Sequence, residues 1–164
     1  MGLERILATV KHFDCRLVEL TGGEPLLQPA ALPLMQQLCD AGYEVLLETG
    51  GGLDISKVDP RVHWVLDIKC PGSGELEGNH FPNPELLTES DEMKFVVADR
   101  RDSEWARDLL LEKRLGEKYG LLLSPVHGEL EGHELARWVL EDHLDVRLQL
   151  ALHKEFFGAD KRGV

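Results

Sequence analysis

Apolar and polar positions along the chain follow two spacings, one typical of helices and one of strands. Residues 1–13 place Leu3, Ile6, Leu7 and Val10 on one helical face, which predicts an amphipathic helix. Beyond it, short runs rich in valine and leucine alternate with segments of helical spacing. The predicted strands are residues 16–20, 43–49, 62–69, 93–97, 119–125 and 146–153, and the further predicted helices are residues 30–42, 103–115 and 132–143. This alternation predicts an α/β fold with about six parallel strands and right-handed crossovers.

The predicted strands lack a clean alternation of apolar and polar residues, which is typical of strands that are covered on both faces. Residues 71–91 are polar and rich in glycine and proline, so we expect a long surface loop there, with a functional loop or lid as one interpretation. No repeat or linker divides the sequence. We therefore expect one domain over residues 1–164.

Composition excludes some classes of partner. The 164 residues include 18 Lys and Arg against 30 Asp and Glu, a net charge of -12 with neutral histidines. Such a chain repels phosphate on average, so we expect neither a nucleic-acid surface nor binding to an anionic membrane. Small anionic ligands in a local site stay compatible with this charge.

Three cysteines, Cys15, Cys39 and Cys70, are too scattered to predict a zinc site or a disulfide framework. We interpret Cys70 as a small buried side chain and not as a nucleophile. The N-terminus does not resemble a signal peptide, and no apolar run approaches the roughly 20 residues of a membrane span. A cytoplasmic protein is the simplest interpretation.

Polar residues recur where the predicted strands end. They are Thr21, Glu24, Glu48, Thr49, Asp67, Lys69, Ser124, His127 and His153. Taken singly, each has an ordinary explanation: the carboxylates would cap the next turn, Lys69 would be a solvated strand end, and a histidine would be hydrogen-bonded in the core. Because the carboxyl ends of parallel strands form one ligand-binding edge, their convergence favours a common site.

A series of motifs carries a family resemblance that covers essentially the whole chain. "LTGGEPLLQ" at residues 20–28 resembles the GGE motif of the radical S-adenosylmethionine (SAM) superfamily. It is followed at matching intervals by "LLETGG", "LDIKCPGSG", "EMKFVV", "LSPVHG" and "LHKEFFGADKRGV". This series is similar to the 7-carboxy-7-deazaguanine synthase family. The resemblance implies a partial (β/α) barrel of the radical SAM type, with the first strand and the cluster loop absent from this chain.

The resemblance also implies a reaction. Members of the family use SAM to contract the ring of 6-carboxy-5,6,7,8-tetrahydropterin, giving 7-carboxy-7-deazaguanine with loss of ammonia, a step in queuosine biosynthesis. Carried over by matching motif, the SAM-binding residues are Gly22, Gly23, Glu24, Pro25, Asp67, Ile68 and Lys69. The substrate-binding residues are Thr21 and Glu48, the latter placed to hold the pterin ring. Glycines let backbone amides reach a ligand, and a carboxylate accepts N–H donors.

Two features depart from the family pattern. The family binds a 4Fe-4S cluster through CxxxCxxC, and this motif is absent from the chain, as is the family's Mg²⁺-binding threonine. We therefore expect no metal ligands in this chain, an N-terminal truncation, and no activity of the chain alone. The second departure is the end of the chain. Many family members carry Gln two residues before "HK", whereas Gln149 lies four residues before His153.

On a strand, Gln149 and His153 would share one face, so both are candidate substrate-binding residues, as is the C-terminal carboxylate at Val164. The resemblance further implies an electron donor such as flavodoxin and a homodimer. Two alternatives stay open: another radical SAM enzyme such as an activase, and a cluster-free remnant that binds SAM or a pterin.

Overall fold

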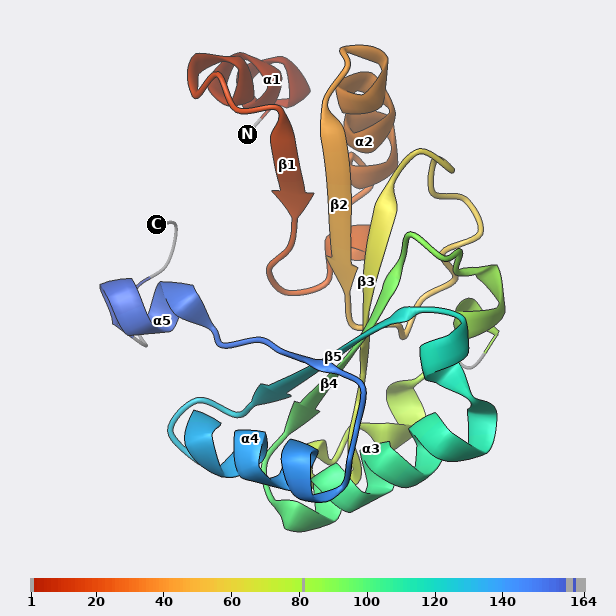
Figure 1. The fold of residues 1–164 in the computed structure, drawn as a ribbon. Helices are drawn as coiled ribbons and strands as arrows, with labels where there is room; N and C mark the ends of the chain where they lie inside the picture. Colours follow the sequence, from red (N-terminus) through yellow and green to blue (C-terminus); the bar gives the residue numbers. More distant parts are fainter. Residues whose placement is uncertain (1, 81, 159–160, 162–164) are drawn as a thin grey trace.

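Residues 2–80, 82–158 and 161 are described by the computed structural model, and six strands in this part form one parallel sheet (Figure 1). The strands are β1 (Leu17–Leu20), β2 (Glu44–Thr49), β3 (His63–Ile68), β4 (Glu92–Val97), β5 (Gly120–Pro125) and β6 (Arg147–Leu148). Each pairs in parallel with the next along the chain, and β1 and β6 are the two edges of the described sheet. The predicted α/β class is therefore confirmed, as an open sheet.

Four helices follow the predicted order, and a fifth, α5, was not predicted. They are α1 (Leu3–His12), α2 (Ala31–Asp40), α3 (Arg100–Lys113), α4 (Gly132–Glu141) and α5 (Leu152–Phe157). Helix α2 contacts β2, α3 contacts β4 and α4 contacts β5. Since right-handed crossovers between successive parallel strands put their helices on the same side, one face of the sheet is covered by helices. We call the opposite face the open face.

Side chains on the two faces differ in character. In β2, Val45, Leu47 and Thr49 are buried on the helix-covered face, whereas Leu46 and Glu48 on the open face are half-buried. Strand β4 alternates in the same way. The expectation that the strands are covered on both faces is wrong for these two. Apolar residues such as Leu46 also occupy open-face positions, which hides the alternation in the sequence.

The last predicted strand is much shorter than expected. Residues 146–153 were predicted as a strand, but β6 ends at Leu148, and His153 lies in α5. The backbone N–H of Gln149 still donates to the carbonyl of Leu123 at 2.9 Å. The next ladder bond would need an N–H at Pro125, which proline lacks, so the pairing stops there.

The long segment between β3 and β4 is fastened by buried polar side chains. The amide of Asn83, fully buried, donates to the carbonyls of Gly51 and Leu53 at 3.1 and 2.7 Å. The amide of Asn79 accepts from the N–H of Lys69 at 2.9 Å and donates to its carbonyl at 3.1 Å. Buried polar groups with satisfied partners hold a loop in one conformation, and these bonds argue against a freely moving lid.

We predict that Asn83→Ala lowers the free energy of unfolding by about 1–3 kcal/mol, because it leaves buried carbonyl groups without donors. Urea unfolding followed by circular dichroism measures this. Glu85→Ala, at an exposed position of the same loop, is the matched control and should change stability by less than about 0.5 kcal/mol. Equal stability of the wild type and Asn83→Ala would contradict the anchoring role.

Candidate active site

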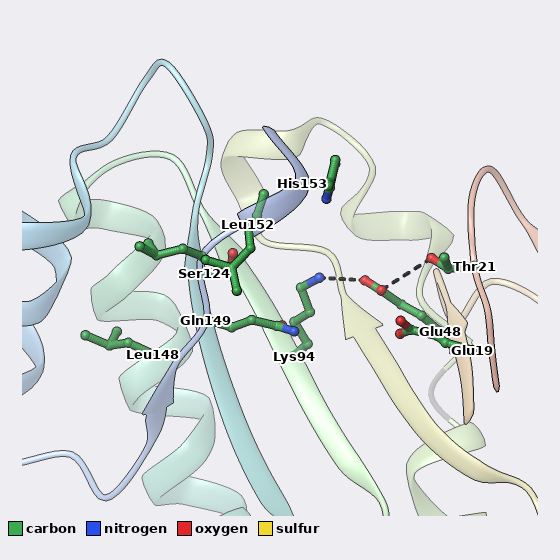
Figure 2. A pocket seen from close by; sticks show the side chains of 11 residues that line it. Glu19, Thr21, Glu48, Lys94, Ser124, Leu148, Gln149, Leu152 and His153 are labelled. Carbon is green, nitrogen blue, oxygen red and sulfur yellow. Dashed lines mark hydrogen bonds and ion pairs between the residues drawn. The ribbon is translucent and has the colours of Figure 1, made fainter. Parts of the chain in front are cut away.

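A cavity of about 610 Å³ lies on the open face, at the carboxyl edge of the sheet (Figure 2). It is lined from β1, β2, β4 and β5 and from β6 with the segment that follows it. The lining residues are Glu19, Thr21, Glu48, Lys94, Ser124, Leu148, Gln149, Leu150, Ala151, Leu152 and His153. Since all strands are parallel, their carboxyl ends share this edge, as the sequence predicted. We call this space the first cavity.

The carboxylate of Glu48 is held at both oxygens. Its Oε1 lies 2.5 Å from the ammonium of Lys94, and its Oε2 accepts from the hydroxyl of Thr21 at 3.3 Å. The side chains of Lys94 and Glu48 are 14% and 24% exposed. An ion pair in such a partly desolvated place is much less screened by salt than one on the surface.

Glu19 lies beside this ion pair, on β1. Burial raises the pKa of its carboxyl above the ordinary value, and the nearby charge of Glu48 raises the pKa further, while Lys94 acts in the opposite direction. Two carboxylates close together favour keeping a proton on one of them. The first cavity therefore contains a carboxylate pair next to one lysine.

The opposite wall of the first cavity carries hydrogen-bonding groups of another kind. Gln149 and His153 both line it, and the hydroxyl residue Ser124 lies near Leu152 on the side of Gln149. Figure 2 shows Lys94 between Gln149 and Glu48, with Thr21 beyond Glu48. The structure thus brings four of the predicted substrate-binding residues, Thr21, Glu48, Gln149 and His153, to one cavity, and their roles stay predictions. Val164 lies outside the described residues.

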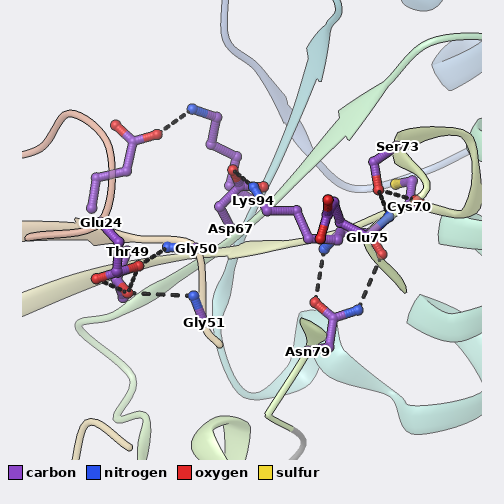
Figure 3. A network of polar contacts seen from close by, with 12 residues as sticks. Glu24, Thr49, Gly50, Gly51, Asp67, Cys70, Ser73, Glu75, Asn79 and Lys94 are labelled. Atoms are coloured by element: carbon purple, nitrogen blue, oxygen red, sulfur yellow. Dashed lines mark hydrogen bonds and ion pairs between the residues drawn. The ribbon is translucent and has the colours of Figure 1, made fainter. Parts of the chain in front are cut away.

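The Thr-Gly-Gly-Glu-Pro loop is tied to the end of β2 (Figure 3). The carboxylate of Glu24 accepts from the hydroxyl of Thr49 at 2.9 and 3.0 Å, from the N–H of Gly50 at 2.9 Å, and from the N–H of Leu26 at 3.0 Å. Thr49 is 1% exposed. In the structure, the carboxylate predicted to face SAM therefore also fixes its own loop, and Pro25 begins a short 3₁₀ turn.

Gly22 and Gly23 are needed for the backbone path of this loop. Their φ angles are +87° and +58°, in the left-handed region that favours glycine. A Cβ at either position would meet no heavy atom within 4 Å. Internal packing therefore does not explain the glycines, and open space beside their backbone is compatible with a bound ligand.

The other predicted SAM-binding residues line a second cavity of about 380 Å³. Asp67, Ile68 and Lys69 lie on its wall together with Cys70 and Asp102. The ammonium of Lys69 is 2.8 Å from Asp67 Oδ2, while the Oδ1 of Asp67 is buried and has no hydrogen-bond partner among the described residues. His127 lines a third cavity and lies 3.4 Å from Glu155, apart from the first cavity.

The cysteines match the interpretation from sequence. Cys70 is 1% exposed, and burial raises the pKa of its thiol to about 12, which makes it a poor nucleophile. Cys15 is exposed and Cys39 is half-buried.

Within residues 2–80, 82–158 and 161, no group of three His, Cys, Asp or Glu side chains is arranged to hold a metal ion. In the same part of the chain, no helix is both long and apolar enough to cross a bilayer.

Two charged residues of the first cavity were missed in the sequence. Glu19 lies within "LVEL" and Lys94 within "EMKFVV". Both side chains point to the open face of the sheet, where they line the first cavity. The signal was a charged residue among the apolar residues of each strand. Both residues lie inside their strands and not past the strand ends: Glu19 precedes the last residue of β1, and Lys94 is three residues before the end of β4.

We predict that Thr49→Val lowers the free energy of unfolding by about 1.5–3 kcal/mol, because a half-buried carboxylate loses a hydroxyl donor while the side-chain volume is nearly unchanged. Urea unfolding measures the loss. The matched control is Thr9→Val, which makes the same change on the exposed surface of α1 and should cost less than about 0.5 kcal/mol. Equal effects of the two variants would refute the proposed anchoring of Glu24.

Two curated proteins that are similar to this chain carry the same name. No family model matches the chain. Among curated proteins, the 7-carboxy-7-deazaguanine synthase of Chlorobaculum tepidum is 46% identical over 167 residues, covering 100% of this chain and 76% of the relative. The synthase of Koribacter versatilis is 41% identical, covering 90% of this chain and 72% of the relative.

Among solved structures, Streptococcus suis SuiB, determined bound to S-adenosylmethionine, superposes with a TM-score of 0.56 over 88% of this chain and 42% of SuiB. At 11% identity this likeness concerns the fold alone. The curated relatives decide the family, since the first of them aligns with the whole of this chain. The chain belongs to the 7-carboxy-7-deazaguanine synthase family.

Proposed function

We propose that this chain binds SAM and 6-carboxy-5,6,7,8-tetrahydropterin for the conversion of the pterin to 7-carboxy-7-deazaguanine with loss of ammonia, a carbon–nitrogen lyase step of queuosine biosynthesis. One observation carries the proposal. The first cavity has carboxylates on one wall and an amide and an imidazole on the other, a pattern that suits a pterin with N–H donors at one end and a carboxylate at the other.

In this pose, Glu48 accepts hydrogen bonds from the amino group and ring N–H of the pterin, and Thr21 keeps the carboxylate in place. Gln149 and His153 donate to the carboxylate at the other end of the substrate. A cavity of about 610 Å³ is within the usual range of roughly 300–1,000 Å³ for small-molecule sites. Each group of the substrate therefore has a complementary partner in this pose.

SAM is assigned to the loop Gly22–Pro25 and to residues Asp67–Lys69. The left-handed glycines leave their backbone accessible, and the unpartnered Oδ1 of Asp67 is an acceptor that a ribose hydroxyl would satisfy. When bound, SAM supplies the radical that abstracts hydrogen from the pterin. The residues of this chain bind and orient the two molecules next to each other.

The remaining parts of the proposal come from the family. They are a 4Fe-4S cluster, Mg²⁺, an electron donor such as flavodoxin, a homodimer and a cytoplasmic location. The described cysteines, one exposed, one half-buried and one buried, do not fit the cluster as ligands. We therefore assign the cluster and Mg²⁺ to no residue of this chain and derive no step through them.

We predict that Glu48→Gln weakens binding of 6-carboxypterin, a stable oxidised analogue of the substrate, about 10- to 100-fold. The reason is that a hydrogen bond to a charged group is worth about 1.5–3 kcal/mol. Isothermal titration calorimetry of the 164-residue chain measures the affinity.

The matched control is Glu44→Gln, the same change at an exposed position on the same strand, and it should leave the affinity unchanged. No binding of 6-carboxypterin by the wild-type chain would overturn the proposal. Equal affinities of the wild type and Glu48→Gln would remove Glu48 from the site.

A further inference from the structure

Lys94 makes an ion pair across an intervening strand. It lies on β4, and its partner Glu48 lies on β2, with β3 between them. The direct neighbour of Lys94 on β3 is Asp67, but the carboxylate of Asp67 is paired with the ammonium of Lys69 at 2.8 Å. Asp67 already has a cation, and Lys94 extends over the open face to the carboxylate of Glu48.

This arrangement fixes a side chain that is otherwise flexible. Lysine has a four-carbon stem, and ordering it costs conformational entropy. The side chain of Lys94 is 14% exposed, so its ammonium needs a charged partner in place of most of its water. Glu48 provides that partner, and Thr21 binds the second oxygen of the same carboxylate. The orientation of Glu48 is thus determined from both sides before any ligand enters.

Glu19 adds a second carboxylate to the first cavity. It lines the same cavity as Glu48, and the proximity of the two negative charges is unfavourable for stability. Among the residues that line the cavity, Lys94 is the cation next to both of them. Groups that cost stability and line a cavity are typical of binding and catalytic sites.

We propose that Lys94 is a positioning residue that sets the charge and orientation of a Glu19–Glu48 carboxylate pair, and that this pair, not Glu48 alone, accepts the N–H donors of the bound pterin. This inference rests on the proposed function and deepens it. The amino end of a pterin presents a ring N–H and both hydrogens of an exocyclic amino group. One carboxylate accepts two parallel N–H groups, and the third hydrogen needs a second acceptor beside the first.

The pH dependence of binding separates positioning from a merely structural role. The charged and titratable groups around the pair are Lys94 on β4, Asp67 on β3 with its partner Lys69, and His153 on α5. Lys94 lowers the pKa of Glu19, which burial and Glu48 raise. Without the ammonium, the Glu19–Glu48 pair keeps a proton to higher pH, and the protonated carboxyl is a poorer acceptor. The loss of affinity for 6-carboxypterin should therefore be largest at low pH.

The experiment measures the affinity for 6-carboxypterin by calorimetry between pH 6 and 8.5 in wild type, Lys94→Met, Lys94→Arg and Lys57→Met. We expect Lys94→Met to weaken binding about 10- to 100-fold at pH 6 and by a smaller factor at pH 8.5. Lys94→Arg should restore most of the affinity, and the exposed control Lys57→Met should bind like the wild type. Affinity for SAM, measured in parallel, should stay within about twofold of the wild type in all three variants.

Two results would overturn the inference while the proposed function stands. One is a Lys94→Met variant that binds 6-carboxypterin like the wild type. The other is a loss that is equal at every pH and extends to SAM, which would indicate a structural role. If the wild type itself fails to bind 6-carboxypterin, the proposed function fails, and the inference fails with it.

Glu19→Gln gives an independent test that does not depend on Lys94. The raised pKa means that the folded state holds the proton more tightly than the unfolded state, so stability is lost as pH rises from the ordinary value of 4.5 through the folded pKa. Removing the charge should raise the thermal midpoint at pH 8, though only modestly because Glu19 is exposed to solvent, and should weaken 6-carboxypterin binding about 5- to 30-fold. Unchanged binding would exclude Glu19 from the pair.

Discussion

The constraint on which the structure depends is the handedness of its crossovers. Successive parallel strands joined by right-handed connections put their helices on one face of the sheet. That face holds the apolar core, with side chains such as Leu47 and Phe95 fully buried. The open face is then free to carry charge. Glu19, Glu48 and Lys94 occupy positions that would be untenable in a sheet covered on both sides.

The end of β2 connects the two candidate binding regions. Glu48 and Thr49 are consecutive, so their side chains point to opposite faces of the sheet. Glu48 lines the first cavity, and Thr49 binds the carboxylate of Glu24 in the glycine loop. A shift of this strand end would move the carboxylate of Glu48 and the glycine loop together. Geometry of this kind suits a reaction in which one bound molecule must act on another at short range.

Much of the fold and part of the candidate site could be predicted from sequence. Strand-length apolar runs separated by helical spacing predicted the order of the elements, and the glycines of residues 20–28 indicated a special loop. The pairing of β6 could not be predicted, because it stops where Pro125 on the neighbouring strand lacks an N–H. Lys94 and Glu19 could not be recognised either. Their importance comes from a cavity formed by strands far apart in sequence, and a charged residue in an apolar strand does not reveal which cavity it faces.

The most direct test of the central claim, that the first cavity binds the pterin beside SAM, is a crystal structure of the chain with SAM and 6-carboxypterin. We predict electron density for the pterin ring in the first cavity, with its amino end within hydrogen-bond distance of Glu48 and its carboxylate near His153. SAM should lie against Gly22 and Gly23. A pterin bound elsewhere while the first cavity holds only water would contradict the account.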